Sequence, residues 1–367
     1  MHRPHGPRAL ARSRWRHIGL GCALWVAFTG APGLACDLCA VYTATETQQG
    51  RTGFSVGAAE QFSYFATVRD GRDRVQNDDE EMRSSITQVL VGYNFTETLG
   101  AQFNLPIISR DFTRVLNGGL DHGDETGLGD ATIVAMYSPL RWVDGSSVVR
   151  GTLIGGIKLP TGSADRLREE VDSTPVRPTF PDVPGRGLPG FGPSATGEGS
   201  GVISRPHSGH GAATSGLHGH DLALGSGSVD GIVGARAFAS WKRLYGTSSV
   251  QYFIRSQGSY NYQYANELLW RVGPGAFLAL DDTGLGRGYT LGLAAALSGE
   301  TKGLDKLSGV KAPDTGFTSI YLGPTMTFTW GESLQAILGG DLPVLQNTSG
   351  VSLVPDFRIQ AALTWRF

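Results

Sequence analysis

Four of the chain's eight histidines fall within a short stretch rich in Gly and Ser. They are His207, His210, His218 and His220, and Asp221 follows the last of them. Imidazole nitrogen binds Zn²⁺, Cu²⁺ and Ni²⁺, and a carboxylate oxygen can complete such a site. These five residues therefore predict a metal site. The alternative is a solvated surface loop, because the spacing matches no fixed structural metal site.

A second pair of candidate ligands, Cys36 and Cys39, lies in the sequence CDLC. In an oxidising compartment such a pair is expected to form a disulfide. Metal binding, redox chemistry and lipidation of Cys36 are the alternatives. A c-type haem site would need His at the next position, where Ala40 stands.

The N-terminus has the pattern of an export signal. Four arginines between residues 8 and 16 precede an apolar run over 18–28, and Gly33-Leu34-Ala35 offers a cleavage site. A membrane-anchor helix is the alternative, but the run is too short to span a bilayer. We therefore expect residues 1–35 to be a signal peptide and 36–51 to be a periplasmic segment of the mature chain.

The last eleven residues alternate between apolar and mostly polar side chains. Positions 357, 359, 361, 363, 365 and 367 are apolar, and the positions between them are mostly polar. Side chains alternate between the two faces of a strand, and a membrane-crossing strand needs about nine to eleven residues of this pattern. Trp365 and Phe367 would join an aromatic girdle. A terminal Phe resembles the C-terminal signature of Gram-negative outer-membrane barrels, which the barrel-insertion machinery recognises.

The same alternation recurs along the chain and predicts an antiparallel transmembrane β-barrel of about twelve strands over residues 52–367. The expected strands are 52–69, 84–97, 98–115, 127–140, 146–162, 221–239, 243–258, 262–281, 286–299, 315–330, 332–345 and 354–367. Mostly long links, at 70–83, 116–126, 163–220, 259–261, 300–314 and 346–353, alternate with mostly tight ones. Outer-membrane barrels have long extracellular loops and short periplasmic turns. Both termini are therefore expected in the periplasm. A periplasmic all-β protein is the main alternative.

The polar face of these strands supplies a third set of candidate residues. Facing inward, they would line a water-filled lumen that passes solutes, or they would pair with one another and fill it. Basic residues outnumber acidic ones in the set. The predicted pore-lining residues are Gln102, Asn104, Arg150, Lys158, Asp230, Arg236, Arg255, Glu267, Arg271, Asp341 and Arg358.

Three stretches together resemble a known family. They are GLGDATIVAMYSPL (127–140), GIKLPTGS (156–163) and GSGSVDGIVGARAF (225–238). They are similar to the outer-membrane channel family named for the MetA pathway of phenol degradation, over roughly residues 85–367. The resemblance implies a twelve-stranded barrel that takes up small, often aromatic, solutes, and it implies no catalytic residues. The long 163–220 loop and the CDLC segment depart from the family pattern.

Composition excludes other classes of function. The 31 Lys and Arg nearly balance the 33 Asp and Glu, so no nucleic-acid partner is expected. A barrel enzyme would need His with Ser or an acid on adjacent strands, and no predicted strand carries His. The acidic run Asp78–Glu81 is expected to be solvated or to bind cations near lipopolysaccharide.

Two functional hypotheses remain. The first is an outer-membrane channel for passive passage of small solutes, embedded in outer-membrane lipid and lipopolysaccharide, with no cofactor. In that case the Gly-, Pro- and His-rich extracellular loop 163–220 would fold over or into the mouth. The second is a scaffold barrel without an open pore, in which the His-rich loop binds Zn, Cu or Ni and the CDLC segment makes periplasmic contacts.

Overall fold

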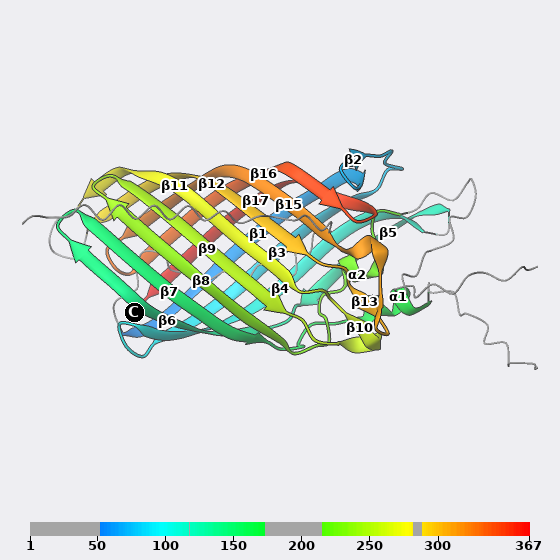
Figure 1. Ribbon diagram of the computed structural model, residues 1–367, viewed down its shortest axis with the longest axis horizontal. Helices are drawn as coiled ribbons and strands as arrows, with labels where there is room; N and C mark the ends of the chain where they lie inside the picture. Colours follow the sequence, from blue (N-terminus) through cyan, green and yellow to red (C-terminus); the bar gives the residue numbers. More distant parts are fainter. Residues whose placement is uncertain (1–51, 117, 173–214, 282–287) are drawn as a thin grey trace, which may run out of the picture. The chain divides into compact units, whose positions relative to one another are not determined.

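The barrel is a single antiparallel sheet closed on itself. The computed structural model describes residues 52–116, 118–172, 215–281 and 288–367. In it β1 (Gly53–Asp70) pairs with β3 (Glu81–Asn94) on one side and with the last strand, β17 (Val351–Arg366), on the other (Figure 1). This closure confirms the predicted twelve-stranded transmembrane barrel. The strands between them are β4 (Leu99–Leu116), β6 (Thr132–Asp144), β7 (Ser147–Lys158), β8 (Asp230–Trp241), β9 (Leu244–Ile254), β11 (Glu267–Asp281), β12 (Tyr289–Lys302), β15 (Phe317–Trp330) and β16 (Leu334–Thr348).

The connections differ strongly in length between the two ends of the barrel. At the turn end, where β1 starts and β17 finishes, the links are 95–98, 145–146, 242–243, 282–288 and 331–333. At the loop end they are 71–80, 117–131, 159–229, 255–266, 303–316 and 349–350. All but one of the loop-end links are longer than the turn-end links, as expected. The exception corrects the prediction of a long link over 346–353, because β16 and β17 continue to a tight turn at Ser349 and Gly350.

The short elements gather at the loop end, where Figure 1 labels β2, β5, α1, α2, β10 and β13. No helix in the described ranges is long and apolar enough to cross a membrane. The short strands are β2 (Asp73–Arg74), β5 (Gly119–Leu128), β10 (Tyr262–Gln263), β13 (Lys306–Leu307) and β14 (Val310–Lys311). The helices are α1 (Arg168–Asp172) and α2 (Gly219–Leu222), with single 3₁₀ turns at Asp165–Leu167, Ser259–Asn261 and Pro313–Thr315.

Three predicted strands began at least five residues too early. One of them is 262–281, because residues 262–263 form the separate short strand β10 and the barrel strand β11 begins only at Glu267. The predicted strand 127–140 spans the end of β5, which forms a hairpin with β4, and most of β6. The predicted strand 221–239 starts in α2, and the barrel strand β8 begins only at Asp230. For 127–140 and 221–239, the Gly-rich sequence before the barrel strand has no alternation that could mark its boundary.

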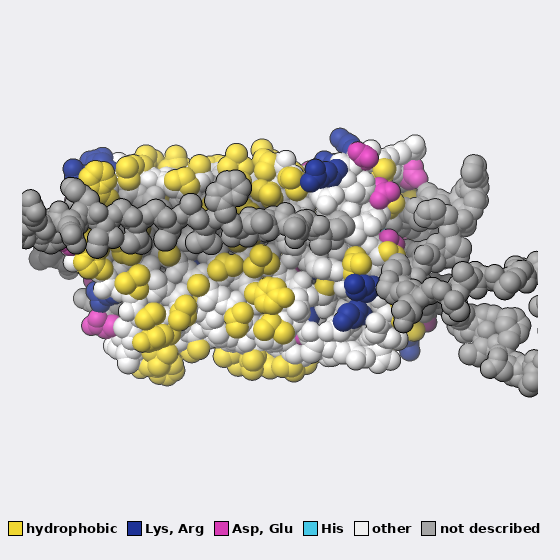
Figure 2. Space-filling view, in the orientation of Figure 1, with side chains coloured by type: hydrophobic (Ala, Val, Ile, Leu, Met, Phe, Trp, Pro, Cys, Tyr) yellow, Lys and Arg dark blue, Asp and Glu magenta, His cyan; other side chains and the backbone are white. Residues whose placement is uncertain are grey.

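The outer wall is apolar. On β17, Ile359 and Leu363 are 47% and 54% exposed, whereas the alternate residues Arg358 and Thr364 are 7% and 4% exposed. Figure 2 shows hydrophobic side chains over the barrel wall, with charged side chains concentrated toward its ends. Exposed aromatic residues gather at the turn end, at Trp142, Trp241, Tyr289, Trp330 and Trp365. They form the aromatic girdle that membrane barrels carry at the lipid–water interface.

Glu60 is an outward-facing carboxylate within this apolar wall. It accepts hydrogen bonds from Ser85 Oγ (2.6 Å) and Thr87 Oγ1 (2.5 Å) on the neighbouring strand β3. These two donors reduce the cost of placing a carboxylate among apolar side chains. The strand β1 therefore fits into the barrel although Glu60 interrupts its apolar outer face.

Candidate functional site

The interior of the barrel holds a cavity of about 230 Å³. Three of the predicted pore-lining residues, Arg236, Arg271 and Arg358, line it. They are joined by apolar and aromatic neighbours that include Leu269 and Tyr245. The lining also includes the carboxylate of Glu300, so the cavity combines an excess of positive charge with an apolar wall.

Ion pairs fix two of the three cavity arginines. Arg271 donates from Nη1 to Asp341 (3.1 Å) and from Nη2 to the Thr325 hydroxyl (2.8 Å). Arg358 donates to Glu300 at 3.1 Å, and its guanidinium carbon lies 3.5 Å from the centroid of the Tyr321 ring. These groups come from β11, β12, β15, β16 and β17, so the pairs cross-link the interior wall.

The predicted residues Lys158, Asp230, Arg255 and Glu267 form a separate buried cluster near the loop end. Asp230 accepts from Lys158 Nζ at 3.0 Å and from Arg255 Nη1 at 2.9 Å. Arg255 also reaches Glu267 at 3.3 Å. These residues are absent from the lining of the described cavity. Their placement favours the interior-filling alternative over pore lining.

Sequence reasoning missed two members of this cluster, Asp130 and Ser226. Lys158 Nζ donates to both side chains, and Asp130 also accepts from the Ser226 backbone N–H at 2.9 Å. Asp130 and Ser226 lie in the motifs GLGD and GSGS. The glycines of these motifs were interpreted as structural, so the polar residues between them were not considered. The cluster holds the start of β8 against the start of β6 and the end of β7.

The remaining predicted residues lie on the inner wall. Gln102 donates to Asn104 two positions away, and both are buried. Arg150 is half-buried near the turn end, Arg366 lies at the turn end of β17, and Arg236 lies at the middle of β8. Among the described residues, the buried carboxylates lie from the middle of the barrel to the loop end: Glu80, Asp130, Asp230, Glu267, Glu300, Asp305 and Asp341. The turn-end half of the interior is therefore basic.

The connection between β7 and β8 enters the barrel mouth. We call its described residues, 159–172 and 215–229, the mouth plug. Leu217 and Leu222 pack in one cluster with the inward-facing side chains of Phe65, Met82 and Phe112. Leu224 packs on Ile86 and Ile108, and Ile86 also lines the cavity. The mouth plug therefore covers the cavity on its loop-end side.

Two buried charges hold the plug through its backbone. Arg110, 1% exposed, donates from Nη1 to the carbonyls of Asp221 (2.7 Å) and Ala223 (3.1 Å). Glu80 accepts from the Ser215 hydroxyl (2.5 Å) and the Gly216 N–H (2.7 Å). The expectation that the acidic run Asp78–Glu81 is solvated is thus wrong for Glu80. Charges buried in this way are costly to leave without their partners.

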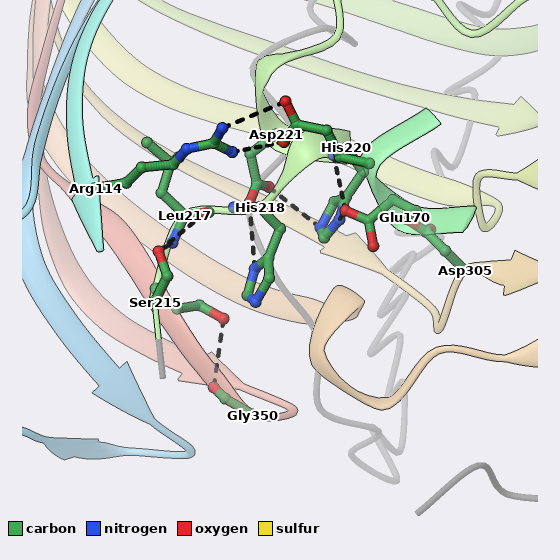
Figure 3. Close-up of polar contacts among 12 residues, drawn as sticks. Arg114, Glu170, Ser215, Leu217, His218, His220, Asp221, Asp305 and Gly350 are labelled. Atoms are coloured by element: carbon green, nitrogen blue, oxygen red, sulfur yellow. Dashed lines mark hydrogen bonds and ion pairs between the residues drawn. The ribbon is translucent and has the colours of Figure 1, made fainter. Parts of the chain in front are cut away.

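The structure brings His218, His220 and Asp221 together at the start of α2, beside Glu170 of α1 (Figure 3). His220 Nδ1 lies 3.0 Å from Glu170 Oε1, and its Nε2 lies 3.4 Å from Asp221 Oδ1. Burial lowers the pKa of His220, but the Asp221 and Glu170 carboxylates outweigh this and raise it to about 9. Burial conversely raises the pKa of Glu170, but His220 lowers it to about 2. Electrostatic attraction therefore holds the two helices together.

The other predicted metal and cysteine residues, His207, His210, Cys36 and Cys39, lie outside the described residues, as do the predicted signal peptide and the segment 36–51. One further histidine corrects an expectation. His122 lies on β5, with Nδ1 at 2.8 Å from the Thr113 hydroxyl. The premise that no strand carries His is therefore wrong, although β5 lies outside the ring of twelve strands.

Neither a protein-family profile nor a curated protein sequence matches the chain. In structure it is similar to an outer-membrane channel from Pseudomonas putida F1, with a TM-score of 0.52 and 13% identity over 89% of this chain and 100% of that one. The β-domain of the Bordetella autotransporter Brka gives a TM-score of 0.40 and 10% identity over 86% of this chain and 100% of that one. The resemblance to the phenol-degradation channel family stays a prediction. The chain has the fold of an outer-membrane β-barrel.

Proposed function

We propose that this protein is an outer-membrane channel that passes small solutes by passive diffusion. The observation that carries the proposal is the cavity of about 230 Å³, enclosed by a barrel with an apolar outer wall and lined by Arg236, Arg271 and Arg358. Sites for drug-sized ligands occupy roughly 300–1,000 Å³, so this one fits smaller molecules. The loop end is extracellular and faces lipopolysaccharide, and both termini are periplasmic.

The cavity lining favours a solute that has both an apolar part and a negative charge. Leu269 and Tyr245 supply apolar and aromatic surface beside the arginines. Small aromatic or largely apolar compounds, carboxylates among them, fit this combination. Passage requires no cofactor and no catalytic residue.

The test of the proposal is the ion current through the mature chain in a planar bilayer. Discrete, reproducible conductance steps are the expected result. Addition of a small aromatic carboxylate should block the current in a concentration-dependent way, and Arg271→Ala should weaken that block. A folded barrel with no current would count against the proposal, and so would a block that Arg271→Ala leaves unchanged.

Replacing Arg236 and Arg366 together by Gln is expected to move the anion preference of the channel toward unity. Arg366 carries positive charge in the turn-end half of the interior, which lacks described buried carboxylates, and Arg236 carries positive charge in the wall of the cavity. Lumen charge sets ion selectivity. The reversal potential in a KCl gradient measures the change. Arg83→Gln is the matched control, because Arg83 is exposed on the outer wall. An unchanged reversal potential in the double variant would refute the assignment.

Phe367→Ala is expected to lower the amount of assembled barrel in cells while leaving refolding in detergent micelles unchanged. The Phe367 side chain is 75% exposed, and its backbone N–H bonds to the Phe54 carbonyl at 3.0 Å. The side chain is therefore available to the insertion machinery, and the backbone contact survives the substitution. Heat-modifiable migration on gels measures both quantities. Equal loss in cells and in micelles would instead assign Phe367 a packing role.

A further inference from the structure

We propose that His218, His220 and Asp221 bind a divalent transition-metal ion of the Zn²⁺, Ni²⁺ and Cu²⁺ class, and that Glu170 positions His220 for this role. The three residues each offer a ligand atom, and these atoms lie within 4.8 Å of one another. In the described part of the chain this is the one such group of His, Cys, Asp or Glu. The site is independent of whether the barrel conducts.

Two imidazole nitrogens in this group are buried without a hydrogen-bond partner among the described residues. They are His218 Nδ1 and His220 Nε2. Both face the same carboxylate, at 3.7 Å from Asp221 Oδ2 and 3.4 Å from Asp221 Oδ1, respectively. The His220 side chain is 3% exposed. An unpaired buried polar atom costs free energy, and a cation placed between the nitrogens and the carboxylate would remove that cost.

Glu170 fixes which nitrogen of His220 is available. Glu170 Oε1 lies 3.0 Å from His220 Nδ1 and 3.1 Å from the His220 backbone nitrogen, which donates to it. When His220 carries a single ring proton, on the Nδ1 that faces Glu170, its Nε2 lone pair points to Asp221, and metal binding displaces the second proton. Metal-binding histidines usually donate their other ring N–H to a carboxylate in this manner, which orients the ring and raises its basicity. Glu170 is thus a positioning residue.

The donor set selects the class of metal. Two imidazoles and one carboxylate suit Zn²⁺, Ni²⁺ and Cu²⁺, whereas Ca²⁺ and Mg²⁺ prefer sites made of oxygen. Three protein ligands leave one position of a four-coordinate ion for water or a solute. Zn–N bonds are about 2.0–2.1 Å long, so the ligand atoms must draw closer together. The two rings are nearly parallel, at 9°, so the more exposed His218 ring must turn.

Metal binding would couple the two arms of the mouth plug, the first at residues 159–172 and the second at residues 215–229. Glu170 belongs to α1 on the first arm. The three ligands are on the second arm, with His220 and Asp221 in α2 and His218 directly before it. The ligand Asp221 also presents its carbonyl to Arg110 on β4. A ligand that binds only the folded arrangement stabilises it. The ion would therefore hold the second arm against the first arm and the barrel wall.

The test is titration of ZnCl₂ and NiCl₂ into chelator-treated, full mature protein in detergent micelles, followed by calorimetry. Cys36→Ser and Cys39→Ser are present in every sample to remove thiol ligands. We expect one ion per chain, with at least tenfold weaker binding in His218→Ala and in Asp221→Asn. Glu170→Gln should weaken binding about 10- to 100-fold. His122→Ala is the matched control and should leave the affinity unchanged.

Spectroscopy shows whether the ligands are those proposed. Electron paramagnetic resonance of bound Cu²⁺ should report two imidazole nitrogens in the parent and one in His218→Ala, a variant whose folding heat-modifiable migration checks. The double variant His207→Ala/His210→Ala should keep both nitrogens. Loss of binding in that double variant, or equal affinity in parent and His218→Ala, would overturn the proposal. Absence of binding in the parent would also overturn it and would leave a proton as the occupant between His220 and Asp221.

Discussion

Replacement of residues 164–224 by a short Gly-Ser linker is expected to raise the single-channel conductance severalfold. The Gly225 N–H donates to the Ser163 carbonyl at 2.8 Å, so the cut ends lie side by side and a short linker can join them. The deletion removes Leu217, Leu222 and Leu224 from the inner wall of β1, β3 and β4. The cavity then opens to the loop end through a mouth that those side chains fill.

A matched variant separates the plug from the rest of the loop. Replacing residues 173–214 by a Gly-Ser linker of equal length keeps the plug's contacts to Arg110 and Glu80. Its conductance is expected to stay close to that of the parent. A similar increase in both variants would mean that the plug contacts do not limit the current. No increase in either would place the limiting constriction elsewhere in the barrel.

The second large effect is expected from Asp230→Asn, which should lower the free energy of unfolding by about 3–5 kcal/mol. Asp230 is 1% exposed and accepts from Lys158, Arg255, the Ser228 hydroxyl and the Ser256 N–H. The substitution keeps the shape of the side chain but removes its charge. Two buried cations then share fewer carboxylates, and removing one partner of a buried ion pair is far more costly than removing a surface partner.

Reversible urea unfolding in lipid vesicles, followed by Trp fluorescence, measures this difference. Glu97→Gln is the control, because Glu97 pairs with Arg141 while both side chains are well exposed, at 64% and 45%. Little change is expected for it. If Asp230→Asn cost no more than Glu97→Gln, the buried cluster would not contribute to holding β8 against β7.

The barrel could be predicted from sequence because side chains of a membrane strand face the lipid and the lumen alternately, so apolar and polar residues alternate along it. The alternation of Ile359 and Leu363 with Arg358 and Thr364 is reproduced in their exposure. The tight turn at Ser349 and Gly350 was missed because residues 346–353 mix polar and apolar side chains without a clear break. The start of β6 was missed because β5 supplies a further strand that pairs with β4 outside the ring.

The site was less predictable because its contacts join residues far apart in sequence. Arg110 reaches the carbonyl of Asp221 across 111 positions, and no local pattern marks such a pair. Leu217, Leu222 and Leu224 lie singly among Gly, His and Ser, so they have no periodicity that predicts burial. Lys158 and Asp230 were correctly placed on the inner face, but only the fold brings Asp130 and Ser226 to them. Nothing in the sequence around Glu170 indicates its role, because its contact with His220 forms only when α1 packs against α2.

The most direct test of the proposed channel is the current through the parent and the 164–224 deletion variant, recorded in planar bilayers under a KCl gradient. We expect discrete steps in both, a severalfold larger step in the deletion variant, and a reversal potential that favours anions. Heat-modifiable migration would first confirm that each barrel is folded. Silence from both folded barrels would contradict the channel proposal and would favour a scaffold whose activity lies at its loop end.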